Sequence, residues 1–173
     1  RQHFPEAPMD TPARAAARAG TTVHEDDALR LWSLDGHVLI ASIKTKMHAI
    51  SPDVVEGLVR GLDLAEQGYE ALVIWSPDDV FSAGADLQAM LPAFMLAGVS
   101  AIESAEHELQ KLMLRLRYAS VPVVSAIRGL ALGGGCELAV YSARRVTALE
   151  SYIGLVEVGV GLVPGAGGLT YIA

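Results

Sequence analysis

Short apolar runs alternate with longer segments of helical period in this chain, and that alternation restricts it to an α/β fold. The runs ALVIWS (71–76) and PVVSAI (122–127) have the length and continuous apolar character of strands that are buried on both faces. Between them, residues 100–117 repeat apolar side chains at helical spacing, which predicts an amphipathic helix. The pattern therefore predicts strands that alternate with helices.

Turn and capping residues locate further elements. Asp35-Gly36 separates two strand-like runs, 28–34 and 37–43, and predicts a β-hairpin. Ser51-Pro52 is typical of a helix N-cap followed by proline at the first helical position, and Gly68 is placed to end that helix. The remaining segments are predicted to be a loop at 76–86, a turn at 128–135, a helix at 136–143 and short strands at 144–149 and 151–156.

The composition bounds the class of protein. A chain of 173 residues that is 51% hydrophobic can bury the core of one domain, and a net charge of −7 argues against a general nucleic-acid-binding surface. Every apolar run is interrupted before it reaches the length of a membrane span. The single cysteine, Cys136, cannot form an internal disulfide, and no secretory signal is visible, so a cytoplasmic location is expected. Residues 1–27 are predicted to be a linker or tail, and residues 28–173 the folded core.

Several motifs that would bind nucleotides or metals fail on inspection. The dinucleotide pattern G-x-G-x-x-G is not completed at any of its candidate starts, and no glycine precedes a lysine as a P-loop requires. The segment HELQK begins like a zinc-binding helix, but Lys111 stands where the second histidine is needed, so no metal site is expected. Cys136 is either an activated thiolate at a helix start or a packing residue, and packing is favoured because no histidine is near it in sequence.

Three consecutive glycines in the segment ALGGGCELAV, Gly133 to Gly135, directly precede a predicted helix. Backbone N–H groups without side chains at the first turn of a helix form an anion site, to which the helix dipole adds positive potential. Such a site would favour the enolate form of a thioester carbonyl, which is oxyanion-hole catalysis. A second donor is expected from another glycine-flanked turn, and FSAGAD (81–86) offers one.

Two carboxylates accompany the glycines. Glu137 falls in the first turn of the predicted helix, and Glu157 is the only charged residue from Ser151 to Ala173. A lone carboxylate in an apolar stretch is costly to bury and usually has a task. Two other interpretations remain open at this point: Glu137 is equally compatible with a charge that only stabilises the helix N-terminus, and Glu157 with an exposed loop.

The motifs FSAGADLQAM, IRGLALGGGCELAV and YIGLVEVGVGLVPGAGG, in this order and spacing, resemble the crotonase superfamily, and most closely its enoyl-CoA hydratases. The resemblance extends from about Ala28 to the last residue. It implies an α/β spiral of repeated ββα units, here truncated at the C-terminus and therefore incomplete, that acts on a coenzyme A (CoA) thioester. It also implies further helices beyond residue 173, without which residues 1–173 alone are expected to bind and catalyse poorly.

The resemblance assigns roles to individual residues. The oxyanion N–H donors are those of Ala85 and Gly134, and the catalytic acids are Glu137 and Glu157, with Val156 where relatives usually have proline. Glu137 is expected to take a proton from water as it attacks C3 of a 2-trans-enoyl-CoA, and Glu157 to protonate C2. Because relatives such as 3,2-enoyl-CoA isomerases typically keep only the second glutamate, the pair favours hydration; isomerisation, other acyl-CoA chemistry and a non-catalytic fragment are the alternatives.

Substrate contacts follow the same resemblance. The acyl-CoA is the substrate rather than a cofactor, and no resident cofactor is expected. Lys44 and Lys46 are predicted to contact the CoA phosphates, but solvated lysines at a strand end are an equally compatible interpretation. Met90 and the helix at 100–117 are candidates for a wall around the acyl chain, although core packing is favoured for most of these positions. The predicted CoA-binding residues are Lys44, Lys46, His48, Ala49, Gly84, Asp86, Leu87 and Gly133.

The resemblance also suggests partners. Hydratases of this family are fused to a 3-hydroxyacyl-CoA dehydrogenase in multifunctional proteins of β-oxidation, and the linker-like composition of residues 1–27 favours such a fusion. In that case NAD would bind the dehydrogenase and not this chain. A homo-oligomer built from trimers is the other expected assembly.

Overall fold

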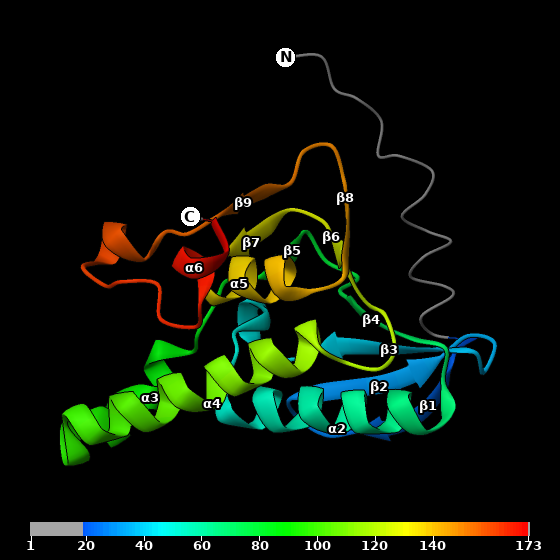
Figure 1. The fold of residues 1–173 in the computed structure, drawn as a ribbon, viewed down its shortest axis with the longest axis horizontal. Helices are drawn as coiled ribbons and strands as arrows, with labels where there is room; N and C mark the ends of the chain where they lie inside the picture. The colour runs from blue at the N-terminus through cyan, green and yellow to red at the C-terminus, as the bar shows by residue number, and fades with distance from the viewer. Residues whose placement is uncertain (1–18, 173) are drawn as a thin grey trace.

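The computed structural model describes residues 19–172, which form two β-sheets and the helices that cover them (Figure 1). The larger sheet has the strand order β1-β2-β3-β4-β6-β8 and the smaller one the order β5-β7-β9. The strands are β1 (Thr21–Glu25), β2 (Leu29–Ser33), β3 (Val38–Ile43), β4 (Ala71–Trp75), β5 (Val80–Ser82), β6 (Val123–Ile127), β7 (Leu130–Leu132), β8 (Arg144–Thr147) and β9 (Tyr152–Gly154). The helices are η1 (Lys46–His48), α2 (Pro52–Gly68), α3 (Leu87–Ala97), α4 (Val99–Arg117), α5 (Gly134–Tyr141), η2 (Glu157–Val160) and α6 (Gly168–Ile172).

Successive ββα units build both sheets together. Strands β4, β6 and β8 join the larger sheet in parallel, and the strand that follows each of them, β5, β7 and β9, joins the smaller one, also in parallel. Helices follow each of these pairs, so the chain winds through both sheets once per unit (Figure 1). The predicted α/β alternation is confirmed.

The local signals for the first unit are confirmed. Strands β2 and β3 pair antiparallel, and Gly36 takes a positive φ of 82° in the hairpin between them. The Ser51 side chain accepts a hydrogen bond from the N–H of Val54 at 3.3 Å and caps α2, which ends at Gly68. The residue types at the turn and at the start of the helix are those that these positions favour.

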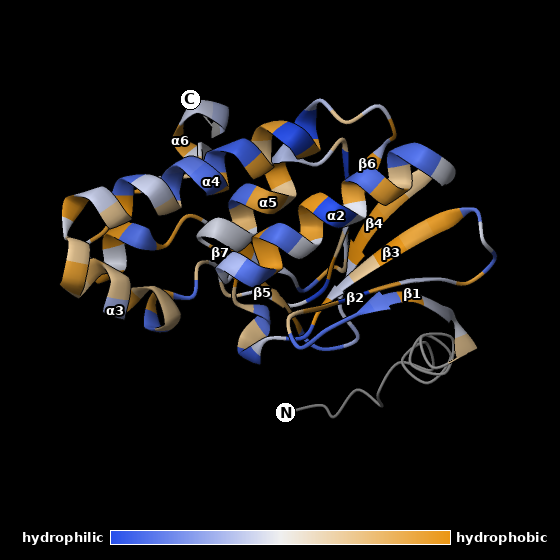
Figure 2. Cartoon of the chain, turned by 90° about the horizontal axis from the view of Figure 1, so that it is seen from below, coloured by the Kyte–Doolittle hydropathy of each residue, from blue (hydrophilic) through white to orange (hydrophobic). Residues whose placement is uncertain are grey.

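The core lies between α2, α4 and the larger sheet. Helix α2 packs along β2, β3 and β4, and α4 packs beside α2 and reaches α5. Figure 2 shows the two helices side by side. The predicted apolar side of α4 is confirmed from Leu109 onward but not at Ile102, which is 43% exposed. No helix among residues 19–172 is long and apolar enough to cross a membrane. The fully buried side chains of α2 and α4 include Leu58, Leu62, Leu112, Met113 and Leu116.

The boundary expected at residue 27 is wrong. Residues 21–25 of the predicted linker form β1, which pairs antiparallel with β2 at the edge of the larger sheet. This strand carries only exposed or half-buried side chains, so it lacks the apolar pattern that would reveal it, and its backbone pairing holds it in place. Residues 1–18 of the predicted linker, and Ala173, lie outside the described residues.

Strands β5 and β7 and helix α3 were not expected from the sequence. Strand β5 lies within the predicted loop 76–86 and β7 within the predicted turn 128–135; each has three residues, too few to show a period. Helix α5 begins at Gly134 rather than at Cys136. Helix α3 has no buried residue, so it shows no amphipathic contrast; Figure 2 draws it almost wholly in the hydrophobic colours.

Candidate active site

Two glycine-containing turns meet where β5 and β7 end. Because these strands are parallel neighbours, the residues that follow them, Gly84 and Gly133, lie at the same edge of the smaller sheet. Both glycines have positive φ, 95° and 52°, and a Cβ on Gly84 would lie 2.8 Å from the carbonyl oxygen of Leu132. The turns therefore require glycine both for conformation and for close approach.

The N–H groups of Ala85 and Gly134 are both free at this edge. Gly134 is the first residue of α5, where the helix leaves the N–H without an internal partner. Within residues 19–172 neither N–H donates a hydrogen bond. A Cβ on Gly134 would lie 3.4 Å from the nitrogen of Ala85, so the two donors are close neighbours. The structure thus brings together the two N–H groups that are predicted to form an anion site.

Glu137 lies one turn into α5 and is only 2% exposed. Its Oε1 accepts a hydrogen bond from the N–H of Gly168 at 2.8 Å. Burial raises the pKa of Glu137 above its ordinary value; the Gly168 hydrogen bond opposes this rise, and the negative charges of Glu157 and Glu106 add to it. A carboxyl of this kind holds or exchanges a proton more readily than a solvated one.

Glu157 is the first residue of η2, directly after β9. Its Oε1 is the oxygen nearest to the glycine triplet, since a Cβ on Gly133 would lie 3.1 Å from Oε1 and 3.9 Å from Oε2. Its Oε2 is buried and has no hydrogen-bond partner in the part of the chain that the structure describes. The half-buried side chain therefore points toward the anion site and not along an exposed loop.

One cavity of about 120 Å³ joins these groups. It lies between the free N–H pair and the carboxylates, and apolar side chains such as Leu109 and Val160 complete its wall. The residues predicted for the site that line this cavity are Gly84, Ala85, Leu87, Gly133, Gly134, Glu137 and Glu157.

A third carboxylate, Glu106 of α4, lines the same cavity and was missed by the sequence analysis. Burial raises the pKa of Glu106, and the negative charge of Glu157 raises it further. A signal was available: Glu106 stands four residues after Ile102 and three before Leu109, on the apolar side of the helix. A carboxylate in that position requires an explanation other than solvation.

A larger apolar cavity of about 530 Å³ lies between α2, α3 and α4. Met90 of α3 and Ile50, before α2, line this cavity. Leu109 lines both cavities and separates them. The suggested acyl wall at Met90 thus borders an open space, whereas Leu112 of α4 is fully buried in the core.

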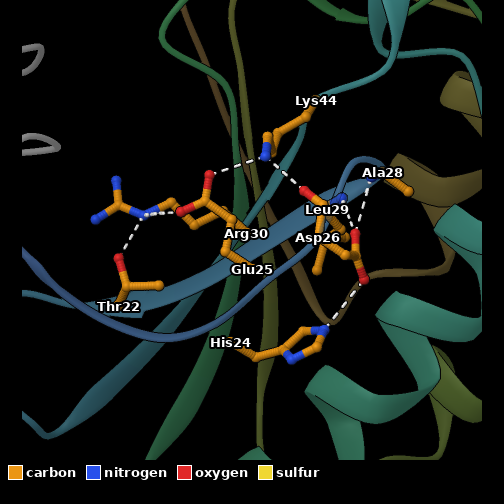
Figure 3. A network of polar contacts seen from close by, with 8 residues as sticks. All are labelled: Thr22, His24, Glu25, Asp26, Ala28, Leu29, Arg30 and Lys44. Atoms are coloured by element: carbon orange, nitrogen blue, oxygen red, sulfur yellow. Dashed lines mark hydrogen bonds and ion pairs between the residues drawn. The ribbon is translucent and has the colours of Figure 1, made fainter.

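The structure does not bring the predicted basic residues to the glutamates. Lys44 donates a hydrogen bond to the carbonyl of Asp26 at 2.5 Å and forms an ion pair with Glu25 at 2.8 Å. Figure 3 shows this network beside β1 and β2. His48 is buried, with Nδ1 2.6 Å from the carbonyl oxygen of Val80. Both residues line a separate cavity of about 340 Å³.

Other predicted residues have local roles. Asp86 caps α3 through Oδ1, which accepts from the N–H of Ala89 at 2.9 Å. Lys46 is exposed at the start of η1, and Ala49 is half-buried just after it. Cys136 is buried and free, and burial raises its pKa, which fits the packing role and not an activated thiolate.

Comparison with known proteins places this geometry in a family. The family model described as "Enoyl-CoA hydratase/isomerase" matches residues 38–173. The chain is 34% identical over 146 residues, 84% of its length, to a Bacillus subtilis protein named "Probable 3-hydroxyacyl-CoA dehydrogenase". It is 41% identical over 106 residues, 60% of its length, to the crotonyl-CoA hydratase of Syntrophomonas wolfei.

A solved structure agrees with the sequence comparison. The crystal structure of an enoyl-CoA hydratase from Polaromonas sp. JS666 has 27% sequence identity and a TM-score of 0.78, and the match covers 84% of this chain and 58% of that one. The chain spans 18% of the Bacillus protein and 38% of the Syntrophomonas protein. The spiral of ββα units and the motifs at residues 81–90, 127–140 and 152–168 have a common explanation: the chain belongs to the enoyl-CoA hydratase/isomerase family of the crotonase superfamily.

Proposed function

We propose that the protein hydrates a 2-trans-enoyl-CoA to the 3-hydroxyacyl-CoA in fatty acid oxidation. The observation that carries the proposal is that two free N–H groups, the buried carboxylate of Glu137 and the half-buried one of Glu157 line one small cavity. Addition of water across a conjugated thioester needs these parts: donors for the oxygen that becomes negative, and a base and an acid for the two protons.

The N–H groups of Ala85 and Gly134 bind the thioester oxygen. As water attacks C3, negative charge moves onto this oxygen, and the fixed donors stabilise it without reorganising. Apolar side chains beside the two N–H groups increase this stabilisation, because they leave fewer water molecules to compete for the hydrogen bonds to the thioester oxygen. This contribution uses backbone only, which is consistent with the glycines that hold both turns in place.

The two glutamates move the protons. Glu137 takes a proton from the water as its oxygen bonds to C3, and Glu157 gives its own proton to C2. The water thus supplies the hydroxyl group, the acid supplies the hydrogen, and the pair ends with the same number of protons as it began. This cycle needs one proton on the pair, and the raised pKa of Glu137 favours the transfer of the water's proton to that carboxylate.

We further propose CoA contacts at the mouth of the cavity. Gly84, Asp86, Leu87 and Gly133 lie on the turns that border the thioester site, and the exposed amine of Lys46 is available for a CoA phosphate. Lys44 would have to leave Glu25 to serve in this way.

Fusion to a dehydrogenase domain is the assembly that we propose, since a relative named as a dehydrogenase contains this chain as 18% of its length. No cofactor is proposed for the hydration step. The single cysteine, buried and free, is consistent with a cytoplasmic protein.

The test is a direct assay of the purified protein with crotonyl-CoA and a long-chain 2-trans-enoyl-CoA, followed by the loss of enoyl absorbance. Isomerisation of a 3-enoyl-CoA is measured in parallel. Hydration of either 2-enoyl substrate, abolished by Glu137→Gln and by Glu157→Gln, supports the proposal. Isomerisation without hydration would replace it with the isomerase alternative.

A further inference from the structure

Glu106 and Glu157 reach the active-site cavity from different elements, α4 and η2, and each has one orphan oxygen. Oε2 of both side chains is buried and lacks a hydrogen-bond partner within the described residues. Buried polar atoms rarely lack a hydrogen-bond partner, because the free energy lost on removing them from water is then not recovered. Two carboxyls in one cavity can supply this hydrogen bond to each other when one of them is protonated.

The packing around Glu106 keeps it at the cavity. Its carboxyl lies against Gly165, where a Cβ would overlap it. One turn further along α4, Nε2 of Gln110 donates a hydrogen bond to the carbonyl of Gly165 at 2.7 Å. Helix α4 is thereby attached to the loop that follows Glu157, and both carboxyls line the same cavity.

The charges around Glu106 favour its protonated form. Glu157 faces it from η2 and Glu137 from α5, and the cavity lining within the described residues contains no lysine, arginine or histidine. On α4 itself, Glu103 and His107 are exposed to solvent. Burial and the charge of Glu157 raise the pKa of Glu106, which favours the form that has an O–H to donate.

We propose that Glu106 is a positioning residue whose protonated carboxyl donates a hydrogen bond to Oε2 of Glu157. Oε1, the oxygen nearest to Gly133, then remains as the atom of Glu157 that exchanges a proton with the substrate. This rests on the proposed hydration, in which Glu157 protonates C2. As pH rises through the raised pKa of Glu106, its carboxyl loses the proton and can no longer donate to Oε2, so Glu157 loses its orientation.

Two substitutions at Glu106 separate this role from simple packing, and an exposed residue of the same helix is the control. Glu106→Gln keeps the shape and an N–H donor at every pH, so kcat at neutral pH stays within about threefold of the parent value, and the alkaline loss of kcat moves to higher pH. Glu106→Leu removes the donor, so kcat falls at least about tenfold at neutral pH while KM changes little. Glu103→Gln changes neither kcat nor its pH profile.

The pH profile of kcat for crotonyl-CoA hydration by the protein and these variants decides the question. An alkaline loss in Glu106→Gln that coincides with that of the parent protein overturns the proposal, as does full activity of Glu106→Leu. The proposed function fails in a different way: Glu157→Gln would then hydrate crotonyl-CoA normally. If Glu157→Gln is inactive and both Glu106 variants behave like Glu103→Gln, only the role of Glu106 is refuted.

Discussion

The Oε1 atom of Glu137 accepts a hydrogen bond from the N–H of Gly168 at 2.8 Å and so joins α5 to the first residue of α6. Gly168 fits there only because it has no side chain, since a Cβ would lie 2.9 Å from Cγ of Glu137. The bond fixes one oxygen of the carboxylate. It compensates only in part for burial, because the pKa of Glu137 is still raised.

The cost of burying the ionised Glu137 carboxylate predicts a pH-dependent gain in stability for Glu137→Gln. With a raised pKa in the folded state, the glutamate favours folding below its ordinary pKa and loses that contribution as pH rises through the folded value. Glutamine avoids the loss, so the variant unfolds with a higher free energy than the parent at pH 7 to 8, by about 1.4 kcal/mol for each unit of the pKa shift. Urea unfolding at pH 7.5 and pH 4 checks this, with no gain expected at pH 4.

The two glutamates should act as one unit in hydration. Glu137→Gln and Glu157→Gln are each expected to lower kcat by about two to four orders of magnitude, the usual contribution of a positioned acid or base. The double variant should lose much less than the product of the two effects, because both residues act on one water molecule. Steady-state kinetics with crotonyl-CoA measure all three, and strictly multiplicative losses would refute a shared proton transfer.

Gly134→Val should abolish turnover while the protein remains folded. The added side chain would begin 3.4 Å from the nitrogen of Ala85, and its methyl groups would fill the space that the thioester oxygen needs. Gly68→Val is the matched control, since nothing lies within 4 Å of a Cβ at the end of α2. Circular dichroism and kcat of both variants are compared; normal turnover by a folded Gly134→Val protein would place the oxyanion donors elsewhere.

Leu112→Ala should destabilise the fold by about 2–5 kcal/mol, as expected for a large-to-small change in a packed core. Leu112 is fully buried in α4, whereas Leu114 is 51% exposed on the same helix. Leu114→Ala should therefore change the free energy of unfolding by no more than about 0.5 kcal/mol. Denaturant unfolding gives both values, and equal losses would mean that α4 does not pack as described.

The elements that the sequence predicts well are those whose conformation is determined by local interactions between residues close in sequence. Ser51 caps α2 and Asp35-Gly36 turns the hairpin through local backbone chemistry, so neither depends on the rest of the fold. Strand β1 and helix α3 lack such signals. The first is held by its pairing with β2 and the second packs against α4, which only the folded structure brings together.

The site also combines local and long-range information. The glycine triplet predicts an anion site, and the uncharged surroundings of Glu157 predict a functional carboxylate. The family resemblance adds Ala85 as the second N–H donor and Glu137 as the second catalytic carboxylate. Glu106 was missed because the cavity it enters is closed by the loop around Gly165, which is remote from it in sequence. For Lys44 and His48 the CoA contact stays a prediction, and the structure adds the partners that each has within the protein, Glu25 and the carbonyl of Val80.

The winding of the chain through two sheets places the reacting groups and helix α3 in different parts of the fold. Ala85, Gly134 and Glu157 each follow the smaller-sheet strand of successive units, so the reacting groups are fixed by β5, β7 and β9. Helix α3 buries none of its residues, yet its Met90 borders the apolar cavity of about 530 Å³. Mutations can therefore accumulate in α3 at little cost to folding and without moving the oxyanion donors. In a lineage of such proteins, the α3 wall of this cavity can therefore change while the oxyanion donors stay in place.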